Sequence, residues 1–242
     1  AHVLIALGDL AGLYGGAKTT ERVSALAIAC VSAAVNFLLR DAGAKGVLNI
    51  ADLNDPARDS GWIILAMGKL GARELNYSSD IDLIIFFDGD APALIDRFEG
   101  IDVFSKLTRR LVRILQERTS DGYVFRTDLR LRFVPCSTPV AIPVEMALQY
   151  SESRGQNWER AAMIKARAAA GDIAMGVEFL DRLKPYIWRK YLDFAAIADI
   201  HAMKRQIHVH KGFGVIGVAG HNIKLGRGGI REIEFFVQTQ QL

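Results

Sequence analysis

The sequence predicts an α/β (α+β) chain, in which a small mixed β-sheet in the middle is flanked by helices and followed by a helical half. Two apolar runs of strand length, residues 62–67 and 81–87, are separated by a glycine-containing turn and a short polar connector. Apolar residues recur at helical spacing around this region, over 19–42, 101–115 and from 143 onward. Half of the residues are hydrophobic and 24% are charged, which is typical of a globular protein.

We expect three parts of one unit: a helical lead-in over residues 1–60, an α/β core over 61–140, and a helical region over 141–242 that completes the site. A chain of 242 residues can bury a substantial core. The last residues, 237–242, still follow a helical pattern, and we therefore expect a fragment of a longer polypeptide.

Charge, cysteine content and hydropathy exclude several classes of protein. The net charge of +3 is too small to indicate a nucleic-acid partner. The two cysteines, Cys30 and Cys136, make neither a disulfide framework nor a metal-binding spacing, and we interpret both as packing residues in a reducing cytoplasm. The most apolar window, Val23 to Leu39, is interrupted by polar residues and is shorter than a bilayer span. We expect no membrane or export segment.

The first element is a helix that begins near Thr19 and Thr20, with Glu21 in its first turn. Its apolar positions follow helical spacing and indicate a core-forming face: Val23, Leu26, Ala27, Cys30, Ala34, Phe37 and Leu38. Gly43 is expected to end it.

The central stretch carries the first chemical signal. An expected strand, Trp62 to Met67, runs into Gly68–Gly71, and the next strand is preceded by Asp80 and contains Asp82. Successive side chains of a strand point to opposite faces, so the two carboxylates share a face with Cα atoms roughly 6.6 Å apart. Two neighbouring carboxylates repel each other unless a cation lies between them, and their oxygens suit a hard divalent ion, Mg²⁺ or Mn²⁺.

Gly68 to Gly71 is predicted to be a turn whose backbone N–H groups, free of side-chain bulk, can approach an anion. On its own, each motif also has a purely structural interpretation, a solvated strand end or a simple turn. Their order along the chain favours a phosphate site beside a metal site. Beyond the second strand, a helix from Ile101 to Glu117 carries a basic face that is either solvated or meets an acidic partner.

Residues Tyr123 to Arg132 alternate as a strand should. One face is apolar, with Phe125, Leu129 and Leu131. The other face is charged: Arg126, Asp128, Arg130 and Arg132. Such a face must meet either water, as on an edge strand, or a charged site. In the second case Asp128 is a third carboxylate and the arginines bind phosphate oxygens bidentately.

From Pro143 onward the spacing is helical and we expect no further strand. One helix is expected over Pro143–Ser153 and another from Asn157 through Arg167, ended by Gly171. On that second helix Lys165 and Arg167 point in different directions and cannot both reach one small site. A basic glycine loop before the last helix makes Lys224, Arg227 and Arg231 additional candidates for binding phosphate.

The glycine turn followed by Ser79-Asp80-x-Asp82 resembles the signature of the nucleotidyltransferase superfamily, and the string from Met67 to Phe86 is similar to the glutamine-synthetase adenylyltransferase family. The resemblance covers nearly the whole chain, including Trp158-Glu159-Arg160 and the Gly229–Phe235 string. The chain departs from the family pattern after Arg132, where proline is displaced to position 135, at Ala161 in place of a tyrosine, and in the glycine-rich stretch 211–220.

This resemblance implies a nucleotidyltransferase-type sheet and a metal-dependent enzyme. The implied catalytic and metal-binding residues are Asp80, Asp82 and Asp128. The implied nucleotide- and phosphate-binding residues are Gly68, Lys69, Gly71, Ser79, Arg126, Arg130, Arg132 and Lys165. The implied cofactor is Mg²⁺ or Mn²⁺.

The resemblance is to the amino-terminal, adenylyl-removing half of the family. It implies phosphorolysis: inorganic phosphate attacks the AMP of an adenylylated tyrosine on glutamine synthetase and ADP is released. The implied regulator in nitrogen metabolism is the PII signalling protein. Two alternatives stay open: the ATP-dependent AMP-attaching direction, and a catalytically silent nucleotide-sensing domain that docks PII or glutamine synthetase.

Overall fold

The structure is a computed structural model that describes residues 1–131, 139–188, 221–224, 226 and 228–241. Its strands are β1 (Trp62–Ala66), β2 (Ile81–Phe87), β3 (Thr127–Asp128), β4 (Ala141–Pro143) and β5 (Arg167–Gly171). Its helices are α1 (His2–Leu10), α2 (Gly16–Ala44), α3 (Gly68–Gly71), the 3₁₀ turn η1 (Arg97–Glu99), α4 (Gly100–Gln116), α5 (Val144–Ser153), α6 (Asn157–Met163), α7 (Ile173–Ile187) and α9 (Ile230–Gln241).

A five-stranded mixed sheet lies at the centre, as the sequence predicts. The hydrogen-bonded order is β3-β2-β1-β5, and β4 also pairs with β2. β1 is antiparallel to both β2 and β5, whereas β3 and β4 run parallel to β2 along its other edge. β3 pairs with the first residues of β2 and β4 with its last residues. The start of β2 is therefore the place where β3 and α3 meet the sheet.

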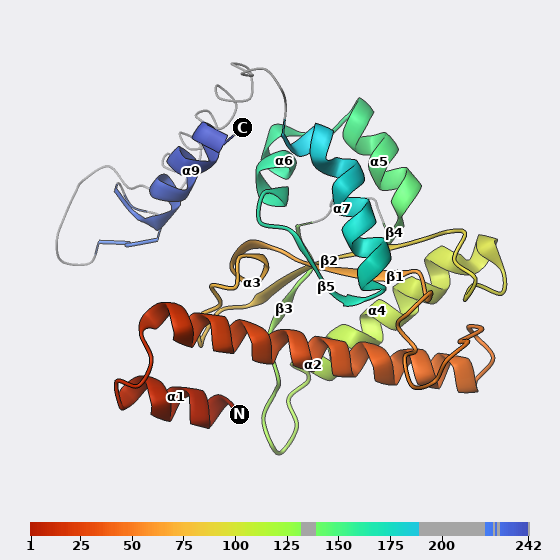
Figure 1. Ribbon diagram of the computed structural model, residues 1–242, viewed down its shortest axis with the longest axis horizontal. Helices are drawn as coiled ribbons and strands as arrows, with labels where there is room; N and C mark the ends of the chain where they lie inside the picture. Colours follow the sequence, from red (N-terminus) through yellow and green to blue (C-terminus); the bar gives the residue numbers. More distant parts are fainter. Residues whose placement is uncertain (132–138, 189–220, 225, 227, 242) are drawn as a thin grey trace.

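Helices cover both faces of this sheet, with α2 and α4 on one side and α5, α6 and α7 on the other (Figure 1). The strand alternation sends Ile81, Leu83 and Ile85 into the core under α2 and α4. It sends Ile84 and Phe86 into a second core against α5 and α7. Asp82 has the same parity as Ile84, so its side chain starts on the α7 side of the sheet.

The long helix α2 begins at Gly16, earlier than predicted, and Gly15 is its N-cap. The Thr19 hydroxyl does not cap this helix but donates to Asp9 Oδ1 at 3.0 Å, which ties α2 to α1. Among the described residues, α2 is the one helix long and apolar enough to cross a membrane. Its buried stripe, including Val23, Ala27 and Leu38, packs on the sheet, as in a core helix of a globular protein.

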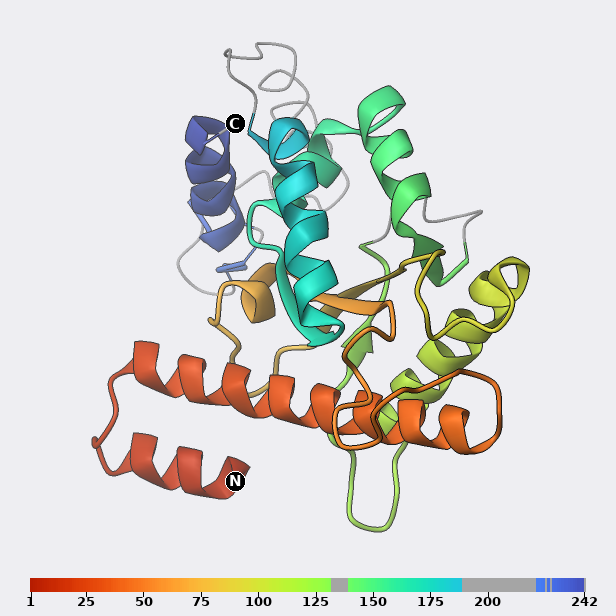
Figure 2. The same cartoon turned by 45° about the vertical axis from the view of Figure 1, so that its right-hand side comes forward.

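The expectation of no strand after Pro143 is wrong, because Arg167–Gly171 forms β5 against the free edge of β1. The predicted helix from Asn157 ends at Met163, and Arg167 is the first residue of the new strand. The sequence Arg-Ala-Ala-Ala-Gly has no β-branched residue, so strand formation here follows from the unpaired edge of β1 and not from intrinsic propensity. Figure 2 shows β5 lying between α7 and α2.

The predicted strand over Tyr123–Arg132 shortens to Thr127–Asp128 among the described residues. Its alternation is also broken: Phe125 and Leu129 pack against the α2–α4 core, whereas Leu131 packs against the other core. Several residues named above lie outside the part of the chain that the structure describes: Arg132, the loop at 133–135, Cys136, the stretch 211–220 and Arg227.

Candidate active site

Three carboxylates gather where β2 and β3 begin. Asp128 of β3 is the direct register partner of Asp82 in the parallel β2–β3 pair. Register partners on adjacent strands point to the same face of a sheet, so the two side chains lie next to each other. Asp80 comes two residues before Asp82, and Ile81 between them is fully buried in the opposite core. The chain therefore presents all three acids on the same side.

The pKa of Asp82 is affected by the proximity of the other two carboxylates. It is raised from 3.8 to about 6, first because the carboxyl is partly buried, and then because the negative charges of Asp128 and Asp80 lie close by. Lys224 and Arg130 are also near enough to act on Asp82, and both lower its pKa. On balance, burial and the two negative charges outweigh the two positive charges, so the pKa of Asp82 stays above its ordinary value.

The other two carboxylates are held by arginines. Arg126 Nε donates to Asp80 Oδ1 at 2.5 Å, and Arg126 Nη2 donates to the carbonyl oxygen of Ser78 at 2.6 Å. Arg130 donates hydrogen bonds to the Asp128 carboxylate from Nε and Nη2, and its backbone N–H donates to Asp128 Oδ1 at 2.8 Å. These bonds from Arg130 lower the pKa of Asp128. Asp82 is thus the acid of the three without such an ion pair among the described residues.

The chemistry of this donor set fits a divalent cation, which would favour the ionised form of Asp82 and relieve the repulsion among the three acids. The described residues nevertheless contain no three Asp, Glu, His or Cys side chains already gathered as metal ligands. In the structure Asp80 Oδ1 accepts from Arg126, and both carboxylate oxygens of Asp128 accept from Arg130.

The turn after β1 lies directly against Asp82. Gly68–Gly71 forms the single helical turn α3, and Gly68 adopts a left-handed φ of +51°. A Cβ atom at Gly68 would lie 3.1 Å from Asp82 Oδ2, so the absence of a side chain at this residue leaves room for the carboxylate beside the turn. The backbone N–H of Met67 donates to the carbonyl oxygen of Asp82 at 2.9 Å.

A strand, a glycine turn beside Asp82, a second acid two residues earlier in the chain and a third acid from the neighbouring strand β3 are the arrangement that the family resemblance implies. Comparison with known proteins identifies the family: residues 1–182 match the family model described as glutamate-ammonia ligase adenylyltransferase. The chain belongs to this family. Residues 201–242 match a second model, described as PII-uridylyltransferase.

Relatives carry the same family description. The chain is 69% identical over 242 residues to a protein of Mesorhizobium japonicum, and 67% identical to one of Brucella suis, each named bifunctional glutamine synthetase adenylyltransferase/adenylyl-removing enzyme. A protein of Xanthobacter autotrophicus with the same name is 55% identical. All three alignments cover 100% of this chain but only 24–25% of the relative. The chain therefore spans about a quarter of the length of these adenylyltransferase relatives.

The residues that the adenylyltransferase resemblance points to are not all at the carboxylate cluster. Gly68 and Arg130 reach it, and Arg126 holds Asp80, while Lys69 lies in α3 and Ser79 directly precedes Asp80. Lys165 lies elsewhere: its Nζ is 3.5 Å from both Glu74 and Glu234. These two carboxylates neutralise its charge.

Lys224, an additional candidate for binding phosphate, also acts on the carboxylate cluster. It precedes α9 and is close enough to Asp82 to lower its pKa. The signal for it in the sequence is the basic glycine loop at the start of the last helix.

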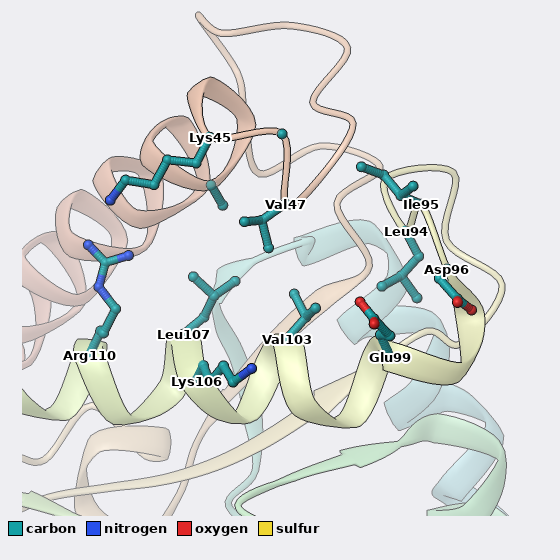
Figure 3. Close-up of a pocket in the computed structure, with 12 residues that line it drawn as sticks. Lys45, Val47, Leu94, Ile95, Asp96, Glu99, Val103, Lys106, Leu107 and Arg110 are labelled. Atoms are coloured by element: carbon teal, nitrogen blue, oxygen red, sulfur yellow. The ribbon is translucent and has the colours of Figure 1, made fainter.

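Two cavities lie away from the cluster. One, of about 560 Å³, separates α3 from α9 and is lined by Gly71, Lys165, Arg167 and Glu234. The other, of about 470 Å³, lies between the end of α2 and the first half of α4. Figure 3 shows apolar side chains such as Val47 and Leu107 pointing into the second cavity. None of the predicted site residues lines this cavity.

Proposed function

We propose that this chain removes AMP from an adenylylated tyrosine of glutamine synthetase by metal-dependent phosphorolysis, with inorganic phosphate as the attacking group and ADP as the product. The observation that carries the proposal is the grouping of Asp80, Asp82 and Asp128, in which two acids raise the pKa of the third. The names of the relatives, which include both adenylyl transfer and adenylyl removal, support the same chemistry.

The three aspartates would hold one or two Mg²⁺ or Mn²⁺ ions, which, when bound, would neutralise the phosphodiester and stabilise the leaving tyrosine oxygen. Asp82 contributes a carboxylate that is already desolvated and held against Gly68. Asp80 and Asp128 contribute the oxygens that now accept hydrogen bonds from arginine.

The cations of the chain bind and orient the two phosphate groups. Arg126 and Arg130, freed from their carboxylates, hold the attacking phosphate and offset its repulsion from the ester. The backbone of α3 with Lys69, together with Ser79, would hold the AMP phosphate. In the reaction a phosphate oxygen forms a bond to the AMP phosphorus, the bond from phosphorus to the tyrosine oxygen breaks, and the tyrosine regains its proton from solvent.

Lys224 is assigned to the same anion site, because it is the described lysine whose charge acts on Asp82. Lys165 is not given a direct role with phosphate, since Glu74 and Glu234 occupy its ammonium group. PII is proposed as the regulator of the full-length protein, on the strength of the family membership alone.

The deciding experiment is product analysis with adenylylated glutamine synthetase, Mg²⁺ and inorganic phosphate. The proposal predicts ADP formation that depends on phosphate and is lost in Asp80→Asn and in Asp82→Asn. Bare glutamine synthetase with ATP is the parallel reaction. Pyrophosphate release there, without ADP in the first reaction, would reassign the chain to the AMP-attaching direction. Tight binding of glutamine synthetase without either product would indicate a silent docking domain.

A further inference from the structure

Arg167, which lies outside the carboxylate cluster, holds the end of α3. It is the first residue of β5, and it pairs with Ala66, the last residue of β1. Its Nε donates to the carbonyl oxygen of Gly71 and its Nη2 to that of Leu70, both at 3.1 Å. The last carbonyl groups of a helix have no partner within the helix, and here the Arg167 guanidinium donates to two of them; the Leu70 carbonyl oxygen also accepts from the backbone N–H of Arg73 at 3.2 Å.

The same end of α3 is in tight contact with the chain that leads into β5. A Cβ atom at Gly71 would lie 1.9 Å from the carbonyl oxygen of Lys165 and 2.7 Å from that of Ala66. Only glycine permits this approach without moving the backbone. Arg167 therefore acts where the turn and the two strand ends come closest together.

The opposite end of α3 lies against the acid. A Cβ atom at Gly68 would lie 3.1 Å from the Asp82 carboxylate, and the preceding residue, Met67, donates its N–H to the Asp82 carbonyl oxygen. α3 is a single turn closed by the bonds from Gly71 N–H to Met67 O and from Ala72 N–H to Gly68 O. These bonds connect its Gly71 end to Met67 and Gly68, the residues beside Asp82.

An open groove of about 560 Å³ lies beside α3, toward α9. Leu70 points into the core and is fully buried, but Ala72 and Gly71 border the groove. On that side no packed neighbour covers the described residues of the turn, so directed hydrogen bonds contribute to holding it. The partly buried Arg167 supplies two of them.

We propose that Arg167 is a positioning residue for the active site: by bridging the carbonyl groups of Leu70 and Gly71 it fixes α3, and with it the placement of Gly68 against Asp82. Arg167 donates both of these bonds within the protein and is not assigned to substrate. The expected effect of Arg167 on the rate of ADP formation rests on the proposed function, whereas its effect on the position of α3 does not.

The test compares Arg167→Gln and Arg167→Lys with the wild type and with Arg40→Gln. Arg40 is the matched control, because it lies on α2, away from the site, and its Nε also donates to a backbone carbonyl oxygen, that of Leu53 at 2.7 Å. Amide hydrogen exchange of each folded variant is measured over 67–75 and, for reference, over β2. ADP formation from adenylylated glutamine synthetase is measured under varied substrate concentration.

We expect faster exchange over 67–75 in both Arg167 variants, with β2 and the Arg40 control unchanged. We also expect kcat to fall about 10–100-fold in Arg167→Gln, the usual loss when a supporting hydrogen-bond partner is removed, with KM for the protein substrate unchanged. Arg167→Lys keeps the charge, but a single flexible nitrogen replaces the planar fork that matches the two carbonyl groups, so we expect its kcat to lie between those of the wild type and Arg167→Gln.

The proposal is overturned if Arg167→Gln is folded and exchanges over 67–75 like the wild type. It also fails if both variants only lose thermal stability while kcat stays at the wild-type value, since Arg167 would then be a structural residue alone. If the wild type itself forms no ADP, the proposed function fails, and the exchange measurement still decides whether Arg167 fixes α3.

Discussion

Arg130 donates to both carboxylate oxygens of Asp128, from Nε at 2.9 Å and 3.0 Å and from Nη2 at 2.5 Å. Asp128 is at the same time the register partner of Asp82. The proposed function assigns Asp128 to the metal ion and Arg130 to the attacking phosphate, but in the structure the two residues are paired with each other. The metal ion and the phosphate would therefore bind in sequence: the metal ion would displace Arg130 from Asp128, and Arg130 would then be available to phosphate.

This competition predicts that Arg130→Gln strengthens metal binding and weakens phosphate binding. Without Arg130, Asp128 is free, and Mn²⁺ should bind the substrate-free protein about two- to fivefold more tightly, the modest value expected for an exposed ion pair. KM for inorganic phosphate should rise about tenfold or more, because a charged donor is lost. Calorimetric titration with Mn²⁺ and steady-state kinetics give the two values.

Arg113→Gln is the matched control for Arg130→Gln. Arg113 makes a similar two-bond contact with Glu117, at 2.8 Å and 3.2 Å, on α4. Neither value should change in this control. Weaker Mn²⁺ binding by Arg130→Gln would contradict the competition.

Asp82→Asn is expected to stabilise the metal-free protein while abolishing ADP formation. The folded pKa of Asp82, about 6, is above its ordinary value of 3.8, so the folded state binds the proton more tightly than the unfolded state. Asp82 therefore costs stability as pH rises from about 4 to 6, and the cost is complete above pH 6. We expect a gain of about 1–2 kcal/mol at pH 7.5, allowing for solvent screening of a partly exposed group, and none at pH 3.5. Urea unfolding at the two pH values, in the presence of a chelator, measures the difference.

Metal affinity should depend on the same titration. Because bound cations require the ionised carboxylate, Mn²⁺ binding should weaken as pH falls through about 6 and should release a proton there. Calorimetry in buffers of different ionisation enthalpy counts that proton. In Asp82→Asn the proton release around pH 6 should be absent, and its persistence would assign it to another group.

Gly68→Ala tests the contact between α3 and Asp82. The substitution adds a Cβ atom 3.1 Å from Asp82 Oδ2 to a residue with a φ of +51°. We expect a loss of about 1 kcal/mol in the free energy of unfolding from the left-handed backbone alone, together with slower ADP formation. Gly46→Ala is the control, since Gly46 has a φ of +66° and open space around its Cβ position. It should reproduce the loss of stability but keep kcat.

Lys224 and Lys165 give a direct comparison of two lysines. Lys224→Gln removes a positive charge that lowers the pKa of Asp82, so that pKa should rise further, and phosphate-dependent turnover should fall about tenfold. Lys165→Gln breaks ion pairs with Glu74 and Glu234 and should change turnover much less. NMR titration of the Asp82 carboxyl and steady-state kinetics distinguish the two. A larger loss of turnover in Lys165→Gln would reverse the assignment.

Alternation along the chain predicts much of the site. The period of two predicts that Asp80 and Asp82 point to the same side, and the charged face of residues 126–130 predicts Asp128 beside them; in the structure Asp128 is the register partner of Asp82, and the charges of Asp80 and Asp128 both act on Asp82. The ion pair of Arg126 with Asp80, 46 residues away, could not be predicted, because side-chain pairing between distant segments depends on a register that local spacing does not contain.

The errors have one physical origin, contacts between parts of the chain that are far apart. Arg167–Gly171 looks helical next to Asn157–Met163, and only the unpaired edge of β1 makes it a strand. Placing Arg167 on a helix also led to the conclusion that it and Lys165 diverge. In the structure both line the cavity beside α3, although Lys165 contacts two glutamates and Arg167 contacts the turn.

The contact between Arg167 and Gly71 joins residues 96 positions apart, and this separation has a consequence for synthesis on the ribosome. β1, α3 and β2 leave the ribosome long before β5 does, so β1 remains an open edge during that interval. Long-range strand pairing forms late and slowly. A nascent chain cut short before residue 167 should therefore lack a fixed α3 and expose a strand edge that other chains can join, so chaperone dependence and aggregation should decrease sharply once β5 has been synthesised.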